Sequence, residues 1–264
     1  MFSPPRPFLV GMIHLPPLPG SPRHQLSLAG LTDHALRDAR RLHEAGFGAL
    51  LIENFGDVPF HGDRIESATI AAMGILAAEI RSATKLPVGI NALRNDAISA
   101  LGIAAAAEAA FIRVNVHTGV AATDQGILQG RADETLRYRR RLNRDIAIFA
   151  DVHVKHATPI SQPDIALAAE ETAYRGLADG LIVTGTTTGR AADLDAVSRV
   201  KQAVPDRPVL VGSGATADNV ARILAVADGV IVGSSLKPGG RPDEPIDPQL
   251  ARAFIQAATE RGNA

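Results

Sequence analysis

The sequence has 264 residues, of which 46% are hydrophobic and 21% are charged, and its formal net charge is −1 at pH 7. A chain of this length and composition can bury a substantial core, which excludes a disordered or low-complexity protein. Because the charge is nearly balanced, no global field attracts nucleic acid or an anionic membrane, and we expect neither as a partner.

The sequence contains no cysteine and no segment that indicates a membrane-spanning helix or a signal peptide. With 0 Cys, the chain has no disulfide, no thiolate zinc site and no cysteine nucleophile. Its longest apolar stretches, such as Ile103 to Ala107, are shorter than the roughly 20 residues that a membrane-spanning helix needs. The opening segment, Met1 to Pro7, lacks the basic and apolar regions of a signal peptide. We therefore expect a cytoplasmic protein with no membrane insertion.

Short runs rich in β-branched residues alternate along the chain with Ala-rich segments of helical period, as in βα units around a parallel sheet. The predicted strands are Phe8–Ile13, Ala49–Glu53, Pro87–Asn91, Ala110–Asn115, Ile146–Asp151, Gly180–Thr184, Pro208–Gly212 and Gly229–Gly233. The predicted helices are Leu31–Ala45, Glu66–Ser82, Asp96–Glu108, Asp133–Asn143, Pro163–Tyr174, Asp193–Ala203, Thr216–Ala225 and Pro248–Thr259.

Eight βα units in roughly 250 residues indicate an α/β fold of the (β/α)8 TIM-barrel type, since a doubly wound sheet more usually has about five to seven strands. We expect a single domain over residues 1–264. Its first strand begins near residue 8, and its closing helix lies near residues 248–259.

Alternation along each barrel strand separates side chains that face the axis from those that pack on the helices. In the fifth strand one set of alternate residues is apolar and faces the helices. The other set, which includes Asp151, His153 and Lys155, therefore points toward the mouth of the barrel. The fourth strand repeats this pattern. Further polar side chains at or beyond strand ends complete a candidate site, whose other members are His14, Glu53, Asn91, Arg113, Asn115, His117, Thr184 and Thr186.

A polar residue at a single strand end often only caps a helix or binds a loop. A whole layer of buried charges is different, because each unpaired charge costs several kcal/mol. Such a cluster at the C-terminal face of a barrel indicates an enzyme. We expect Glu53, Asp151, His153 and Lys155 to be catalytic, and the other polar residues at the mouth to bind substrate.

Two neighbouring strand ends carry small residues that allow close approach of an anion to backbone N–H groups. These residues are Gly212, Ser213, Gly214, Gly233, Ser234 and Ser235. They predict a phosphate site after strands seven and eight, where many barrels bind one. The alternative is that the glycines only make tight turns.

Two long connections could close over the mouth as lids, or form plain surface excursions. The first, from His14 to Pro22, is rich in proline, and the second runs from His117 to Ile127.

Five sequence motifs closely resemble the BtpA family, also called the BtpA/SgcQ family. These motifs are residues 11–20 (GMIHLPPLPG), 52–60 (IENFGDVPF), 113–119 (RVNVHTG), 150–156 (ADVHVKH) and 185–189 (GTTTG). The resemblance covers about Phe8 to Phe254 and implies a barrel related to the ribulose-phosphate-binding group. The family name derives from a role in photosystem I biogenesis in cyanobacteria, and the resemblance supplies no catalytic assignment.

The function that these residues favour is an enzyme acting on a phosphorylated sugar or nucleoside-like metabolite, by isomerase, lyase or aldolase, or glycosyl-bond hydrolase chemistry. Arg113 would hold an anionic group, and Lys155 would stabilise negative charge or act as a Schiff-base amine. Glu53, Asp151 and His153 would act in proton transfer or hold a divalent metal as a cofactor. We expect a homo-oligomer. The alternative is a non-catalytic assembly or stability factor for a membrane complex such as photosystem I.

Overall fold

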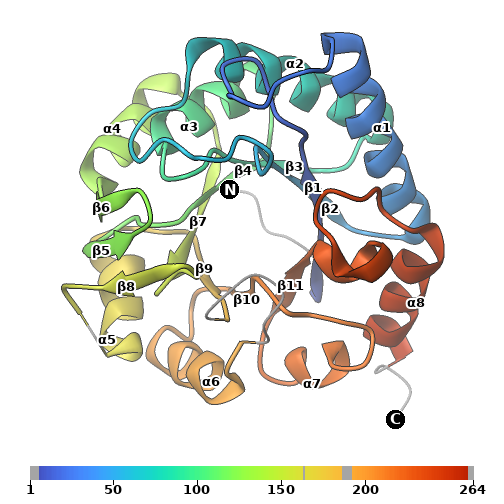
Figure 1. Ribbon diagram of the computed structural model, residues 1–264. Coiled ribbons are helices and arrows are strands. Elements are labelled where there is room, and N and C mark those ends of the chain that lie inside the picture. The colour runs from blue at the N-terminus through green and yellow to red at the C-terminus, as the bar shows by residue number, and fades with distance from the viewer. Residues whose placement is uncertain (1–5, 163, 186–191, 261–264) are drawn as a thin grey trace.

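The structure is a computed structural model that describes residues 6–162, 164–185 and 192–260. Eight parallel strands form a closed barrel in the order β1-β2-β3-β4-β7-β9-β10-β11, ringed by helices (Figure 1). The strands are β1 (Phe8–His14), β2 (Ala49–Glu53), β3 (Val88–Asn91), β4 (Phe111–Val114), β7 (Ala147–Val152), β9 (Gly180–Val183), β10 (Val209–Val211) and β11 (Gly229–Val232). The predicted TIM barrel is confirmed.

Each barrel strand is followed by helical structure that covers the outside of the barrel. The helices are α1 (Leu28–Ala45), α2 (Ser67–Thr84), α3 (Ala97–Ala106), α4 (Ala132–Leu142), α5 (Ile165–Glu170), the π-helical turn η1 (Glu171–Arg175), α6 (Leu194–Ala203), α7 (Val220–Ile223), the 3-10 turns η2 (Ser234–Leu236) and η3 (Pro238–Gly240), and α8 (Pro248–Thr259). None of the helices in the described ranges is long and apolar enough to cross a bilayer.

The starts of two helices differ from the prediction by three or four residues, because side chains bond to the backbone there. Helix α1 begins three residues early, since the Ser27 hydroxyl accepts the Gly30 N–H at 3.2 Å and caps the helix. Helix α7 is only four residues long because Asn219 bonds both to the Thr216 N–H and to the Gly214 carbonyl. These side-chain bonds hold residues 214–219 as a turn rather than as the first helical turn.

Three short strands outside the barrel were not predicted. β5 (Val120–Thr123), β6 (Gly126–Gln129) and β8 (Ala157–Pro159) pair antiparallel in the order β6-β5-β8 and lie beside α4 and α5 (Figure 1). The connection expected to run from His117 to Ile127 is therefore largely a β-hairpin. It is joined by a strand from the loop that follows β7.

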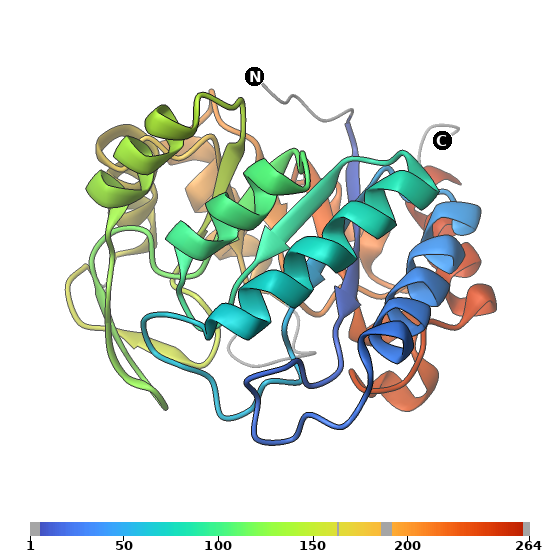
Figure 2. The same cartoon turned by 90° about the horizontal axis from the view of Figure 1, so that it is seen from above.

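The connection after β1 is tied to the loop after β2 rather than standing free. Leu15 N–H donates to the Glu53 carbonyl at 2.9 Å, and Gly56 N–H donates to the Leu15 carbonyl at 3.0 Å. A Cβ atom at Gly56 would lie 2.4 Å from the nitrogen of Pro17, so the two main chains touch. Figure 2 shows both loops, in dark blue and cyan, at the same end of the barrel.

The inside of the barrel is packed with apolar side chains below this end. Phe8, Phe111 and Phe149 form a triangle with ring centroids 5.5 to 6.1 Å apart. Gly89 and Gly180 make room for two of these rings, since a Cβ at either position would lie within 2.4 Å of a ring carbon. The three rings close the floor of the barrel, so the polar side chains one step further along the strands can meet only at the mouth.

Candidate functional site

Arg113 on β4 and Asp151 on β7 form a fully buried ion pair at the mouth. Arg113 Nη2 lies 2.9 Å from Asp151 Oδ1, and Arg113 Nε lies 3.0 Å from Oδ2. Asn115 Nδ2 also donates to Oδ2, at 2.6 Å. Both oxygens of Asp151 are therefore engaged by its neighbours. This geometry makes Asp151 a positioning group for Arg113 and Asn115, rather than an available base or metal ligand.

Two atoms of this cluster are buried without a hydrogen bond to any residue in the described part of the chain. They are Arg113 Nη1, which is a donor, and Asn115 Oδ1, which is an acceptor. A buried polar atom without a partner costs free energy, and at the mouth of a barrel such atoms are suited to bind a ligand.

Glu53 at the end of β2 is held by Asn91 at the end of β3. Asn91 Nδ2 donates to Glu53 Oε2 at 2.5 Å, while His14 Nε2 lies 4.0 Å from Oε1. The pairing of β1 with β2 and of β2 with β3 puts these three residues at the same level of the barrel. The carboxylate is therefore fixed through one oxygen, and its other oxygen faces the imidazole.

The main chain at Lys155 is anchored on both sides. Its N–H donates to Thr184 Oγ1 at 2.9 Å, and its carbonyl accepts from Arg94 Nη2 at 2.6 Å. The Lys155 ammonium makes no ion pair with any described residue. Burial lowers the pKa of Lys155, although the nearby Glu53 carboxylate opposes this change.

Two cavities open at this end of the barrel and share Lys155. The first, the strand-end cavity, has a volume of about 170 Å³. Its lining includes Met12, His14, Arg113, Lys155 and the six small residues Gly212, Ser213, Gly214, Gly233, Ser234 and Ser235. The second, the phenylalanine cavity, has a volume of about 430 Å³. It is lined by Glu53, Phe55, Val58, Phe60, Leu93, Arg94, Asn115, Asp124, Lys155 and His156.

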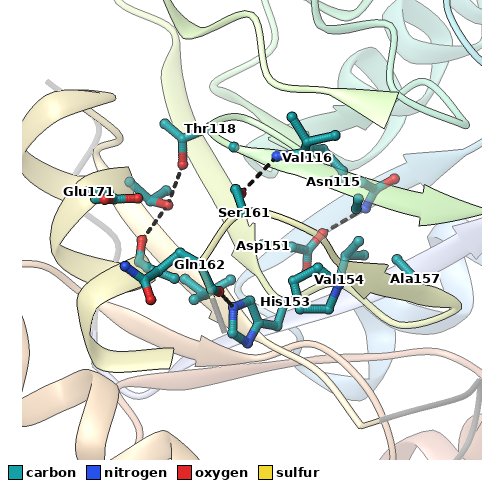
Figure 3. A pocket seen from close by; sticks show the side chains of 17 residues that line it. Asn115, Val116, Thr118, Asp151, His153, Val154, Ala157, Ser161, Gln162 and Glu171 are labelled. Atoms are coloured by element: carbon teal, nitrogen blue, oxygen red, sulfur yellow. Dashed lines mark hydrogen bonds between the residues drawn. The ribbon is translucent and has the colours of Figure 1, made fainter. Parts of the chain in front are cut away.

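The structure thus brings together most of the side chains expected at the mouth, but His153 is not among them. β7 ends at Val152, and His153 has a positive φ of 53°, which turns its side chain out of the strand alternation. Its Nε2 donates to the Gln162 carbonyl at 2.7 Å, in a small third cavity of about 50 Å³ between Asn115, Asp151 and α5 (Figure 3). The expectation that His153 joins Glu53 and Lys155 is wrong.

His117 also lies away from both larger cavities, since its Nε2 donates to the Gly176 carbonyl at 2.8 Å. It follows β4 after the strand has ended at Val114, so alternation no longer applies. Thr184 binds the main chain of Lys155 and does not line either larger cavity. Thr186 lies outside the described residues.

The predicted metal ligands Glu53, Asp151 and His153 are not assembled into a site. Within residues 6–162, 164–185 and 192–260, no three His, Asp or Glu side chains come together in a group that could hold a metal ion. Asp151 is occupied by Arg113, and His153 lies in the third cavity.

Several residues of the mouth were missed because they follow the strands in loops. Phe55, Phe60, Arg94 and His156 line the phenylalanine cavity from the loops after β2, β3 and β7. Strand alternation does not extend into loops. For Phe55, Arg94 and His156 the available signal was their position two to four residues after a strand end, where barrel sites are built. Phe60 lies seven residues after β2, and this signal does not reach it.

His14 provides a pH-dependence that can be measured. Burial lowers the pKa of His14 well below its usual range, and the charges of Lys237, Lys155 and Arg113 lower it further. Between the ordinary value of about 6.5 and this lower value, the unfolded chain binds more protons than the folded protein. We therefore expect the contribution of neutral His14 to the free energy of unfolding to be fully present above about pH 6.5. It should fall as the pH drops toward the lowered pKa.

Urea unfolding at pH 7 and pH 5 tests this expectation in the native protein and in His14→Gln. The variant should lose less stability on acidification. Part of the loss should persist, because burial also lowers the pKa of His117. Equal losses in the two proteins would contradict the assignment to His14.

Similarity to known proteins supplies a family for this barrel. The chain is 46% identical over 252 residues to the photosystem I biogenesis protein BtpA of Synechocystis, which covers 96% of this chain and 88% of the relative. It is also 46% identical over 252 residues to an uncharacterized protein of Thermococcus kodakarensis, which covers 96% of this chain and 95% of that relative.

Among solved structures, N-(5'-phosphoribosyl)anthranilate isomerase from Pyrococcus furiosus matches with a TM-score of 0.58 and 15% identity, over 96% of this chain and 99% of that one. At this identity the likeness concerns the fold alone. The sequence matches the model of the BtpA family over residues 6–260, and the chain belongs to that family.

Proposed function

We propose that this protein is an enzyme that acts on a phosphorylated sugar or nucleoside-like metabolite by acid–base chemistry. The observation that carries the proposal is the strand-end cavity, where six small strand-end residues lie with Arg113 and Lys155. An anion in this cavity would find a buried arginine with an unbonded Nη1 and a lysine without an ion pair in the described chain. Both groups favour a phosphate.

The short helical elements α7 and η2 after β10 and β11 change how such a phosphate would be held. Elements of three or four residues contribute little helix dipole, so binding would depend on backbone N–H groups and on the two cations. The name of the Pyrococcus furiosus isomerase specifies a phosphoribosyl substrate on the same fold, which supports a phosphorylated ligand here.

Proton transfer would be carried out by Glu53, with Lys155 stabilising negative charge that develops on the substrate. Asn91 holds one oxygen of the carboxylate, and the other faces His14. Because burial lowers the pKa of His14, its imidazole is neutral at pH 7 and can donate or accept a hydrogen bond. These roles suit isomerisation, aldol or lyase cleavage, or hydrolysis of a glycosyl bond. Asp151 would orient Arg113.

The second candidate is an assembly or stability factor for a membrane complex, which the name of the Synechocystis relative favours. The relative from Thermococcus kodakarensis is equally similar, and its name specifies no such complex. An assembly factor also has little need for a buried Glu53 and a partly buried Lys155 at a barrel mouth. The homo-oligomeric state and the cytoplasmic location stay predictions from the sequence.

Binding of inorganic phosphate and ribose 5-phosphate tests the proposal, by calorimetry and by the rise in Tm that a ligand of the folded state causes. In Ser234→Asp, a new carboxylate in the strand-end cavity should weaken both ligands by about tenfold or more, equivalent to about 1.4 kcal/mol of repulsion.

The matched control is Ser82→Asp, which adds the same charge at an exposed position near the end of α2, a helix that leads to the start of β3. This variant should bind like the native protein. Failure of both ligands to bind the native protein, or equal weakening in the two variants, would contradict the proposal.

A further inference from the structure

The phenylalanine cavity contains aromatic side chains that the core does not require. Five phenylalanines of the described chain are 1 to 2% exposed: Phe8, Phe47, Phe111, Phe149 and Phe254. The other two that the structure describes, Phe55 and Phe60, are only partly buried, and both line this cavity. Exposed aromatic surface is costly in water, so its concentration at one cavity indicates a binding surface.

The apolar character extends beyond the two rings. Val58 is 37% exposed and lines the cavity together with Leu93. The Phe55 ring centroid lies 4.8 Å from that of His14, so this apolar wall begins directly beside the polar centre of the mouth. A volume of about 430 Å³ falls within the range of roughly 300 to 1,000 Å³ that is usual for small-molecule sites.

The polar groups between the apolar wall and the strand-end cavity are suited to hydroxyl groups. Glu53 provides a carboxylate, and Asn115 Oδ1 accepts no hydrogen bond within the described chain. Both residues line the phenylalanine cavity, and Lys155 lines both cavities. One ligand can therefore contact cations at one end, acceptors in its middle and aromatic rings at its other end.

We propose that the substrate is a sugar phosphate that carries a planar apolar or aromatic ring, and that Phe55 and Phe60 bind this ring. The phosphate would occupy the strand-end cavity, and the sugar hydroxyls would face Glu53 and Asn115. This inference rests on the proposed function because it assumes phosphate binding after β10 and β11. It goes further by excluding a plain sugar phosphate as the preferred ligand.

Calorimetry with a series of probes tests the ring site in the native protein. The probes are inorganic phosphate, ribose 5-phosphate, uridine 5'-monophosphate and adenosine 5'-monophosphate. At least one nucleotide should bind about tenfold or more tightly than ribose 5-phosphate, the scale of stacking a base on an aromatic side chain. In Phe60→Ala this advantage should fall to less than about threefold, with ribose 5-phosphate affinity unchanged.

Two further variants make the result specific. Phe55→Leu keeps an apolar contact beside His14 but removes the aromatic ring of Phe55. It should therefore also reduce the advantage of the nucleotides over ribose 5-phosphate. Ile127→Ala removes an apolar side chain that is 73% exposed on β6, and it should bind all probes like the native protein.

The outcomes distinguish a failure of the ring site from a failure of the phosphate site in the proposed function. If ribose 5-phosphate binds and neither nucleotide binds more tightly, the ring site is wrong and the phosphate site stands. If no phosphorylated probe binds, both proposals fail. If Phe60→Ala weakens ribose 5-phosphate as much as the nucleotides, Phe60 has no ring-specific role and the inference is overturned.

Discussion

Replacement of Asp151 by asparagine is expected to lower the free energy of unfolding by about 3–5 kcal/mol, the usual cost of removing one partner of a buried ion pair. Arg113 would stay buried at the mouth with no carboxylate to neutralise it, since its side chain is 1% exposed and pairs with Asp151 through two nitrogen atoms. From the sequence alone this substitution would be expected to spare the fold and remove a catalytic base. Because Asp151 is paired with Arg113, we expect the substitution to destabilise the fold instead.

Urea unfolding at pH 7 measures the effect. Asp133→Asn is the matched control, because Asp133 pairs with Arg137 on α4 with both side chains at least 70% exposed, and such pairs contribute about 1 kcal/mol or less. The double variant Arg113→Met, Asp151→Leu should recover much of the lost stability, since it leaves no unpaired charge. An Asp151→Asn variant as stable as the control would show that the pair does not hold the mouth together.

Replacement of Lys155 by methionine is expected to weaken ligand binding without lowering the stability of the fold. Affinity for ribose 5-phosphate should fall by about a hundredfold, the scale of removing one preorganised charged group from a binding site. Stability should be unchanged or higher, because the native protein keeps a desolvated ammonium that pairs with no described carboxylate. A gain in stability with a loss of binding is typical of a functional residue.

The pH dependence of stability gives an independent measure of the same lysine. Burial lowers the pKa of Lys155, so between this lowered value and the ordinary value near 10.4 the unfolded chain binds more protons than the folded protein. This difference makes the native protein gain stability with rising pH in that window, and Lys155→Met should lack this gain. A variant that binds normally, or one that is strongly destabilised, would contradict the role given to Lys155.

The eight strands could be predicted from the sequence because each is a short apolar run between turn residues. Alternation also placed Arg113, Asp151 and Glu53 inside the barrel. It did not reveal that Arg113 neutralises Asp151, because that contact depends on the register between β4 and β7, in which Arg113 lies opposite Phe149. The sequence of either strand contains no information about that register.

Alternation fails where the chain leaves the strand. His153 and His117 follow the ends of β7 and β4, and each bonds to a carbonyl outside the mouth. Lys155 returns to the mouth two residues after His153, held by Thr184 and Arg94. Phe55 and Phe60 come from a loop whose path depends on contacts with the loop after β1, and no local pattern in the sequence describes such contacts.

The direct contact between the main chains at Gly56 and Pro17 determines which parts of the mouth can vary. Any side chain at residue 56 would push the proline segment away, and the bonds that join Leu15 to Glu53 and to Gly56 would transmit this shift to the end of β2. We therefore expect the two loops that meet at Pro17 and Gly56 to tolerate neither insertions nor substitutions at the contact. The hairpin of β5 and β6 brings Asp124 to the phenylalanine cavity from the other side of the mouth, and Ile127 beside its turn is 73% exposed. If the mouth binds the proposed ligand, we expect changes in ligand preference to be accommodated most readily in this hairpin.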